Sequence, residues 1–152
     1  MIPITANFTF MEIALQEAEK AQKNGEVPVG AIIVKNNKII ATANNQTRSS
    51  LDPSAHAEIV VIRKACKILK TDRLINCDLY VTLEPCNMCS GAISFARIRR
   101  LYYATPDPKG GAVENGTNFF SQKSCFHSPE IYSCLSQNKS QLLLKNFFKQ
   151  KR

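Results

Sequence analysis

The stretch "LYVTLEPCNMCSGA", residues 79–92, joins an apolar run directly to a helix signal. Its first half is rich in aliphatic, aromatic and β-branched residues, which is typical of a buried strand. Pro85 follows with the backbone angle that a first helical turn needs, and small residues come next. We therefore expect a strand over 78–83 and a helix from Pro85 to about Ala96, with almost no loop between them.

The rest of the chain repeats this alternation of helix and strand. We expect strands at 29–34, 38–43, 100–104 and around Ile131, and the Asn36-Asn37 turn makes the first two a hairpin. Further helices are predicted at 8–23, from the N-cap Asp52 and Pro53 to about Leu69, and at 142–148. This order predicts an α/β fold of three layers, α/β/α, in which helices cover both faces of a mixed sheet of about five strands.

Size and composition predict a single domain over residues 1–152. Of these residues 44% are hydrophobic and 21% charged, and neither a repeat nor a linker divides the chain. No apolar run reaches the roughly 18 residues of a membrane span, and we find no secretory signal, so we expect a cytoplasmic protein without membrane contact. Six cysteines in such a protein argue against a disulfide scaffold, and Cys66 and Cys77 are predicted to be buried core thiols.

The net charge of +8 is unevenly distributed. After Glu114 the only acid is Glu130, whereas this segment carries six basic residues: Lys123, Lys139, Lys145, Lys149, Lys151 and Arg152. Arg97, Arg99 and Arg100 form a second cluster. A basic protein of ordinary solubility would need no such asymmetry, so the pattern favours a nucleic-acid partner.

Cys86 and Cys89 have the spacing of metal ligands. Being three residues apart in a first helical turn, they present both sulfurs to the same side. The partial positive charge of a helix N-terminus favours their thiolate forms, which zinc requires. His56, at the start of another predicted helix, would complete a set of three protein ligands. A zinc ion held by three ligands keeps one coordination position open, which is typical of a catalytic site.

Glu58 follows His56 by two residues, a spacing at which side chains in the middle of a helix diverge. At a helix end pointing toward the metal, both side chains can reach the same place. Glu58 would then act as a general acid and base beside the open zinc position.

A lone Cys-x-x-Cys is weak evidence for catalysis, and a structural zinc site would need a fourth ligand. Cys125, His127 and Cys134 are the candidates, although His127 alone is more typical of a surface loop. The combination of "HAE" at one helix start and "PCNMC" at another is far more specific. This H-x-E…P-C-x-x-C pattern is the signature of zinc-dependent nucleobase deaminases.

Five motifs resemble one family in order and spacing: "EVPVGAIIV", "DPSAHAE", "LYVTLEPCNMCSGA", "DPKGGA" and "FFKQKR". The family is that of the bacterial tRNA-specific adenosine deaminases, and the resemblance covers nearly the whole chain. It implies a cytidine-deaminase-like fold, one zinc ion per chain and a homodimer. The implied reaction converts the wobble adenosine of a tRNA anticodon stem-loop to inosine and releases ammonia.

The resemblance also implies roles for single residues. His56, Cys86 and Cys89 would hold zinc, and Glu58 would shuttle protons. Six positions would contact the RNA: Asn45 the target nucleotide, Val29 and Leu83 the base as apolar walls, Asp107 the sugar-phosphate, and Phe148 and Lys149 the anticodon loop. Asn44, Thr105-Pro106 and Lys149 depart from the residues common in that family, which concerns how RNA is held and not the zinc site.

Two other functions remain open from the sequence. A zinc deaminase of a free base or nucleoside, such as guanine or cytidine, would share the zinc motifs but would not need a basic C-terminal helix. A non-catalytic, zinc-stabilised RNA-binding module is the more remote alternative, because a structural zinc gains nothing from the carboxylate of Glu58.

Overall fold

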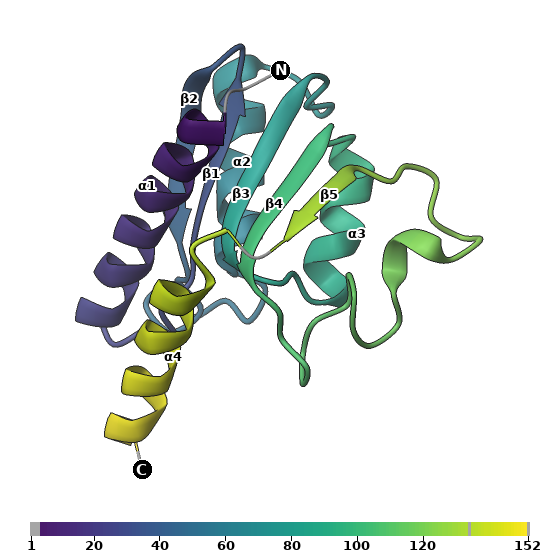
Figure 1. The fold of residues 1–152 in the computed structure, drawn as a ribbon. Helices are drawn as coiled ribbons and strands as arrows, with labels where there is room; N and C mark the ends of the chain where they lie inside the picture. Colours follow the sequence, from purple (N-terminus) through teal and green to yellow (C-terminus); the bar gives the residue numbers. More distant parts are fainter. Residues whose placement is uncertain (1–3, 134, 152) are drawn as a thin grey trace.

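The computed structural model describes residues 4–133 and 135–151 (Figure 1). The elements follow in the order α1 (Ile4–Lys23), β1 (Gly30–Lys35), β2 (Lys38–Asn44), α2 (Ala57–Leu69), β3 (Cys77–Leu83), α3 (Asn87–Ala96), β4 (Arg100–Thr105), a short 3-10 helix η1 (Phe119–Ser121), β5 (Glu130–Ser133) and α4 (Gln137–Lys151).

The five strands form one mixed sheet in the order β2-β1-β3-β4-β5. β1 pairs antiparallel with β2 and β3, whereas β3–β4 and β4–β5 are parallel. Asn36 and Asn37 have φ angles of 51° and 63°, as a tight hairpin turn with the twist of its strands requires. The predicted hairpin and the short strand around Ile131 are both confirmed.

Helices cover both faces of the sheet. Figure 1 shows α1 and α4 together on one face and α2 and α3 on the other. Alternate residues of β1 therefore enter different cores: Ala31 and Ile33 pack under α2 and α3, and Ile32 and Val34 pack under α1. A sheet with two covered faces needs such continuously apolar strands. The predicted three-layer α/β/α fold is confirmed.

The predicted starts of two helices were wrong. α2 begins at Ala57 with His56 as its N-cap, and α3 begins at Asn87 with Cys86 as its N-cap. Asp52 instead accepts hydrogen bonds from the amide and hydroxyl of Ser54, at 2.9 and 2.7 Å, and so stabilises a turn before the helix. Such local bonds compete with helix formation, which explains why an N-cap residue type followed by proline did not start one here.

The remaining differences concern ends and burial. α1 begins four residues before the predicted range, and α4 extends beyond 142–148 on both sides. Cys77 is buried as predicted, while Cys66 is only partly covered. Among the described residues, none of the helices combines the length and the apolar character needed to cross a membrane.

Candidate active site

Two helix N-termini meet at the end of β3. His56 and Cys86 are the N-cap residues of α2 and α3, yet neither side chain makes a capping hydrogen bond to its own helix. They converge with Cys89, from the first turn of α3. The His56 Nδ1 atom lies 3.6 Å from Cys86 Sγ and 3.5 Å from Cys89 Sγ, and the three donor atoms all lie within 4.8 Å of one another. One nitrogen and two sulfurs in this arrangement fit a single zinc ion.

The local electrostatics favour a cation at this point. Hydrogen bonds from Cys89 and from the His56 ring lower the pKa of Cys86 to about 4, against the opposing effect of burial. The N-terminus of α3 acts in the same direction, because its partial positive charge stabilises a thiolate. The folded structure therefore favours the thiolate form of Cys86, which is the form that binds a metal ion.

Glu58 lies beside the three converging residues without being one of them. It is the second residue of α2, and only 4% of its surface is exposed. Burial raises the pKa of its carboxyl group to about 7. A carboxyl group with a pKa near neutrality can both give and take a proton at physiological pH.

His56, Cys86 and Glu58 border a cavity of about 300 Å³. Val29, Asn45, Leu83 and Asp107, which the sequence placed at the substrate, all line this cavity. Asn45 is anchored through its main chain, whose amide donates to the Val29 carbonyl at 3.0 Å. The sequence interpretation missed four further lining residues: Val27, Thr47, Glu84 and Gly110.

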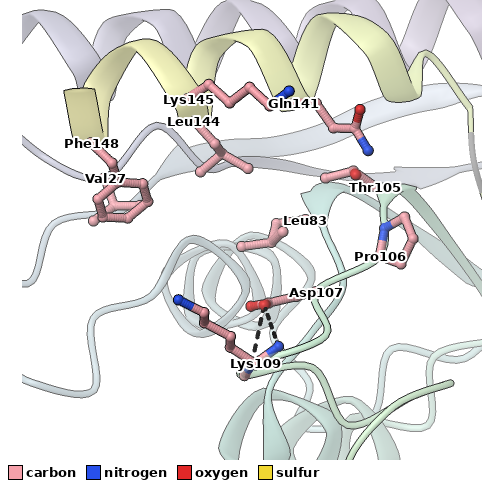
Figure 2. Close-up of a pocket in the computed structure, with 11 residues that line it drawn as sticks. Val27, Leu83, Thr105, Pro106, Asp107, Lys109, Gln141, Leu144, Lys145 and Phe148 are labelled. Carbon is pink, nitrogen blue, oxygen red and sulfur yellow. Dashed lines mark hydrogen bonds between the residues drawn. The ribbon is translucent and has the colours of Figure 1, made fainter.

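A longer groove of about 830 Å³ runs between α4 and the segment 105–110. It shares one wall with the first cavity, because Val27, Leu83, Asp107 and Gly110 line both. Figure 2 shows Leu144 and Lys145 of α4 across this groove from Leu83, Asp107 and Lys109.

Phe148 and Lys149 are not part of the cavity beside the cysteines. Phe148 lines the groove, and Lys149 borders a neighbouring hollow together with Phe148 and Asp107. Phe148 is 49% exposed, whereas Phe147 is buried at 5%. The two adjacent phenylalanines therefore face different environments, one the groove and the other the core.

The other candidate metal ligands lie elsewhere or outside the described residues. Cys125 Sγ donates to the His127 carbonyl at 3.1 Å and lies 3.6 Å from Ser94 Oγ. The His127 ring contacts the Ile98 carbonyl, at the end of α3 that is remote from Cys86. Within the described part of the chain, only His56, Cys86 and Cys89 form a group that could hold a metal ion. Cys134 lies outside the described residues.

Two of the three arginines in the cluster of Arg97, Arg99 and Arg100 form ion pairs within the protein, so the cluster offers less unpaired positive charge than the sequence suggests. Arg99 pairs with buried Asp78 at 2.9 Å, and Arg100 pairs with Glu130 at 2.8 Å. These two arginines connect β3, β4 and β5 and are largely neutralised by their partners. Lys109 and Lys145 line the groove and Lys149 borders the neighbouring hollow, so these three lysines lie next to the site.

Known proteins resemble this chain in sequence and in fold. The family model for the cytidine and deoxycytidylate deaminase zinc-binding region matches residues 5–105. The tRNA-specific adenosine deaminase of Agrobacterium fabrum is 57% identical over 143 residues, which cover 94% of each chain. A structure from studies of A-to-I editing by tRNA:A34 deaminases at the wobble position is also 57% identical, with a TM-score of 0.89 over 90% of this chain and 99% of that one.

A guanine deaminase from Bacillus subtilis is more distant: it is 45% identical, with a TM-score of 0.63, over 64% of this chain and 63% of its own. The full-length agreement with the tRNA-specific enzymes, together with the converging histidine and cysteines, identifies the subgroup. The chain belongs to the zinc-binding cytidine and deoxycytidylate deaminase family, within its group of tRNA-specific adenosine deaminases.

Proposed function

We propose that this enzyme hydrolyses the amino group of the wobble adenosine in a tRNA anticodon stem-loop, forming inosine and releasing ammonia. Its relatives carry that activity in their names, and the zinc-type ligand set and the neighbouring acid supply the chemistry. A homodimer and a cytoplasmic location are kept as predictions from the sequence.

The observation that carries the proposal is the wall shared by the two cavities. A free base needs only the cavity of about 300 Å³ at His56, Cys86 and Glu58. A nucleotide that remains part of an RNA strand also needs a path for its neighbours. The groove beside α4 begins at the same Leu83 and Asp107 and is bordered by lysines. A base turned out of an anticodon loop can enter the cavity while the strand follows the groove.

His56, Cys86 and Cys89 would hold the zinc ion, which when bound supplies Lewis-acid activation of the attacking water. Glu58 would accept a proton from that water and deliver it to the ring nitrogen next to the amino-bearing carbon. It would then move the second proton to the departing amine, so that ammonia leaves and the carbonyl of inosine remains. A buried carboxyl group with a pKa of about 7 suits both transfers.

The substrate residues divide between the two cavities. The side-chain amide of Asn45 would hydrogen-bond the target nucleotide. Val29 and Leu83 would contact the base as apolar walls of its pocket. Asp107, on the shared wall, would face the sugar-phosphate. Phe148 offers an exposed ring for stacking, and Lys149 offers a charge for a phosphate.

The 45% identity with a guanine deaminase favours a second candidate, deamination of a free purine. Ammonia release from an anticodon stem-loop, from free guanine and from cytidine, each over a range of concentrations, would separate the two. The proposal predicts a kcat/KM for the stem-loop at least about 100-fold above that for either small molecule, because remote contacts in the groove contribute only to RNA. A preference for guanine or cytidine would refute it.

A further inference from the structure

Glu84 is a buried carboxylate that has no part in the chemistry described above. It is 3% exposed and lies between β3 and Cys86. Its two oxygens accept five hydrogen bonds from one loop: from the amides of Asp107 (2.9 Å), Val113 (3.0 Å), Glu114 (2.9 Å) and Asn115 (3.1 Å), and from Asn115 Nδ2 (2.7 Å).

The loop 107–115 closes tightly around this carboxylate. The Gly111 amide donates to the Asp107 carbonyl and the Ala112 amide to the Pro85 carbonyl, both at 2.9 Å. A Cβ atom on Gly111 would lie only 2.4 Å from the Glu84 carboxyl carbon. The loop therefore requires glycine at this position, because any side chain would displace the carboxylate or the backbone.

This carboxylate connects the two parts of the site. Glu84 precedes the metal-ligand residue Cys86 by two positions. Its Oε1 atom holds the amide of Asp107, and the Asp107 carboxylate in turn accepts the amides of Lys109 and Gly110, both at 3.1 Å. Asp107 and Gly110 form part of the wall that the cavity and the groove share. A continuous set of hydrogen bonds thus runs from the end of β3 to the substrate wall.

We propose that Glu84 is a positioning residue for the substrate: it holds the Asp107–Gly110 wall in the place where this wall binds the nucleotide. This role rests on the proposed RNA substrate. Glu84 neither holds the metal nor transfers a proton. It acts through Asp107.

The ionised carboxylate is well suited to this task because it only accepts hydrogen bonds. Glutamine has almost the same shape, but its NH₂ group would face amides that are themselves donors. Glu84→Gln therefore removes acceptors from the loop with little change in volume. The loop would lose the acceptors that hold its amides in place, while β3, α3 and the cysteines keep their packing.

The test measures KM, kcat and zinc content for Glu84→Gln with an anticodon stem-loop substrate. We expect KM to rise at least about tenfold, because a displaced wall binds the nucleotide less well, while kcat and zinc content stay close to wild type. Hydrogen exchange at the amides of residues 107 and 113–115 should accelerate in the variant. Asp78→Asn is the matched control, because Asp78 is a buried carboxylate near the other end of β3, where it pairs with Arg99. It should lower stability without changing KM.

A double-mutant comparison separates positioning from a general structural effect. In an Asp107→Ala background, Glu84→Gln should raise KM by less than about twofold, because the residue through which it acts is already gone. An equal rise in both backgrounds, or an equal rise in Asp78→Asn, would overturn the proposal. So would unchanged KM and unchanged exchange in Glu84→Gln.

Asn115→Ala provides a second variant should Glu84→Gln fail to fold. It removes one donor from the network and leaves Glu84 in place. We expect a smaller rise in KM with faster exchange at residue 107, and no change in either would also overturn the proposal. A wild-type enzyme that neither binds nor edits the stem-loop would instead refute the proposed function, and the substrate-positioning role with it.

Discussion

His56 and Cys86 occupy N-cap positions, where a polar side chain ordinarily accepts an amide hydrogen bond from its own helix. Here both side chains turn away from the helix amides and toward each other. The arrangement gives up capping stabilisation at two helices, each about 1 kcal/mol in typical cases. It gains a point at which two positive helix ends and three ligand atoms meet. It also places Glu58, the second residue of α2, next to that point.

Cys89→Ser tests the metal-ligand set. The serine hydroxyl is a poor zinc ligand beside a thiolate, so we expect zinc content to fall from about one ion per chain to well below half. Metal analysis of the purified variant measures this. Cys125→Ser is the control and should keep its zinc, because Cys125 contacts Ser94 and His127 instead. Full zinc occupancy in Cys89→Ser, or zinc loss in Cys125→Ser, would contradict the assignment.

Glu58→Ala tests the proton-transfer role. Glu58 is buried and is not one of the three converging ligand residues, so the variant should fold and retain zinc. Its kcat should fall at least ~100-fold, the lower end for the loss of a general acid and base. Activity near the wild-type value in the zinc-loaded variant would show that another group moves the protons.

The sequence was sufficient to predict that the residues of the candidate metal site lie together, because their positions depend on local spacing. His56, Glu58, Cys86 and Cys89 lie within a few positions of helix starts, and their chemistry has few alternatives. Glu84 was different, because its partners are main-chain amides more than 20 residues away. A charged residue at the end of an apolar strand was the only available signal, and it did not indicate which loop would close around the carboxylate.

At the scale of elements, α4 places two adjacent phenylalanines in different environments. Phe147 packs into the molecule, and Phe148 lies in the groove beside the site. The sequence predicted the helix α4 but underestimated its length. Polar residues at 137–141 hid its first turn, although Ser140 is buried there and donates to the Thr82 carbonyl of β3.

The two phenylalanines provide a matched pair of substitutions. Phe148→Ala should weaken stem-loop binding by about 1–3 kcal/mol, the value of one base stacked on an aromatic ring, with little change in stability. Phe147→Ala should instead destabilise the fold by roughly 3–5 kcal/mol, as expected for a buried ring. Binding titrations and denaturant unfolding of both variants distinguish these effects. Equal binding by Phe148→Ala and wild type would exclude a stacking role.

Glu26 organises the loop after β2 in the way that Glu84 organises the loop after β4. It is buried and accepts the amides of Arg48 and Ser49, at 3.2 and 2.8 Å. Burial alone would raise the pKa of Glu26, but these hydrogen bonds outweigh it and hold the pKa below its ordinary value of 4.5. The folded state therefore favours the ionised form.

The pH dependence of stability tests this role of Glu26. Its contribution should be fully present above pH 4.5 and lost as the pH falls through the lowered pKa of the folded state. Glu26→Gln should thus be less stable than wild type at pH 7, and the difference should shrink toward acid pH. Urea unfolding of both proteins at pH 7, 5 and 3 measures it. A difference that is constant with pH would contradict the account.

For the molecule as a whole, the distribution of charge matters more than the net value of +8. Arg99 and Arg100 are paired within the sheet, which no sequence pattern indicated because their partners come from other strands. Lys145 and Lys149 border the groove and its neighbouring hollow. We expect these lysines to carry most of the salt-dependent attraction for RNA.

Salt titration of stem-loop binding tests that expectation. Lys145→Gln combined with Lys149→Gln should reduce the slope of log K against log salt concentration by about 2, roughly one unit per phosphate contact. Lys38→Gln combined with Lys67→Gln is the control with the same charge change. Lys38 lies at the start of β2 and Lys67 in the last turn of α2, both remote from the groove. Equal slopes in the two double variants would show that net charge, and not the groove, determines binding.

The central claim is that the cavity and the groove together deaminate an adenosine that remains part of a tRNA. Sequencing cDNA made from tRNA after incubation with the purified, zinc-loaded protein tests it most directly, because inosine is read as guanosine. The account predicts adenosine-to-guanosine conversion at the wobble position with the wild-type protein and none with Glu58→Ala. Unconverted wobble adenosine, or conversion spread over adenosines outside the anticodon, would contradict it.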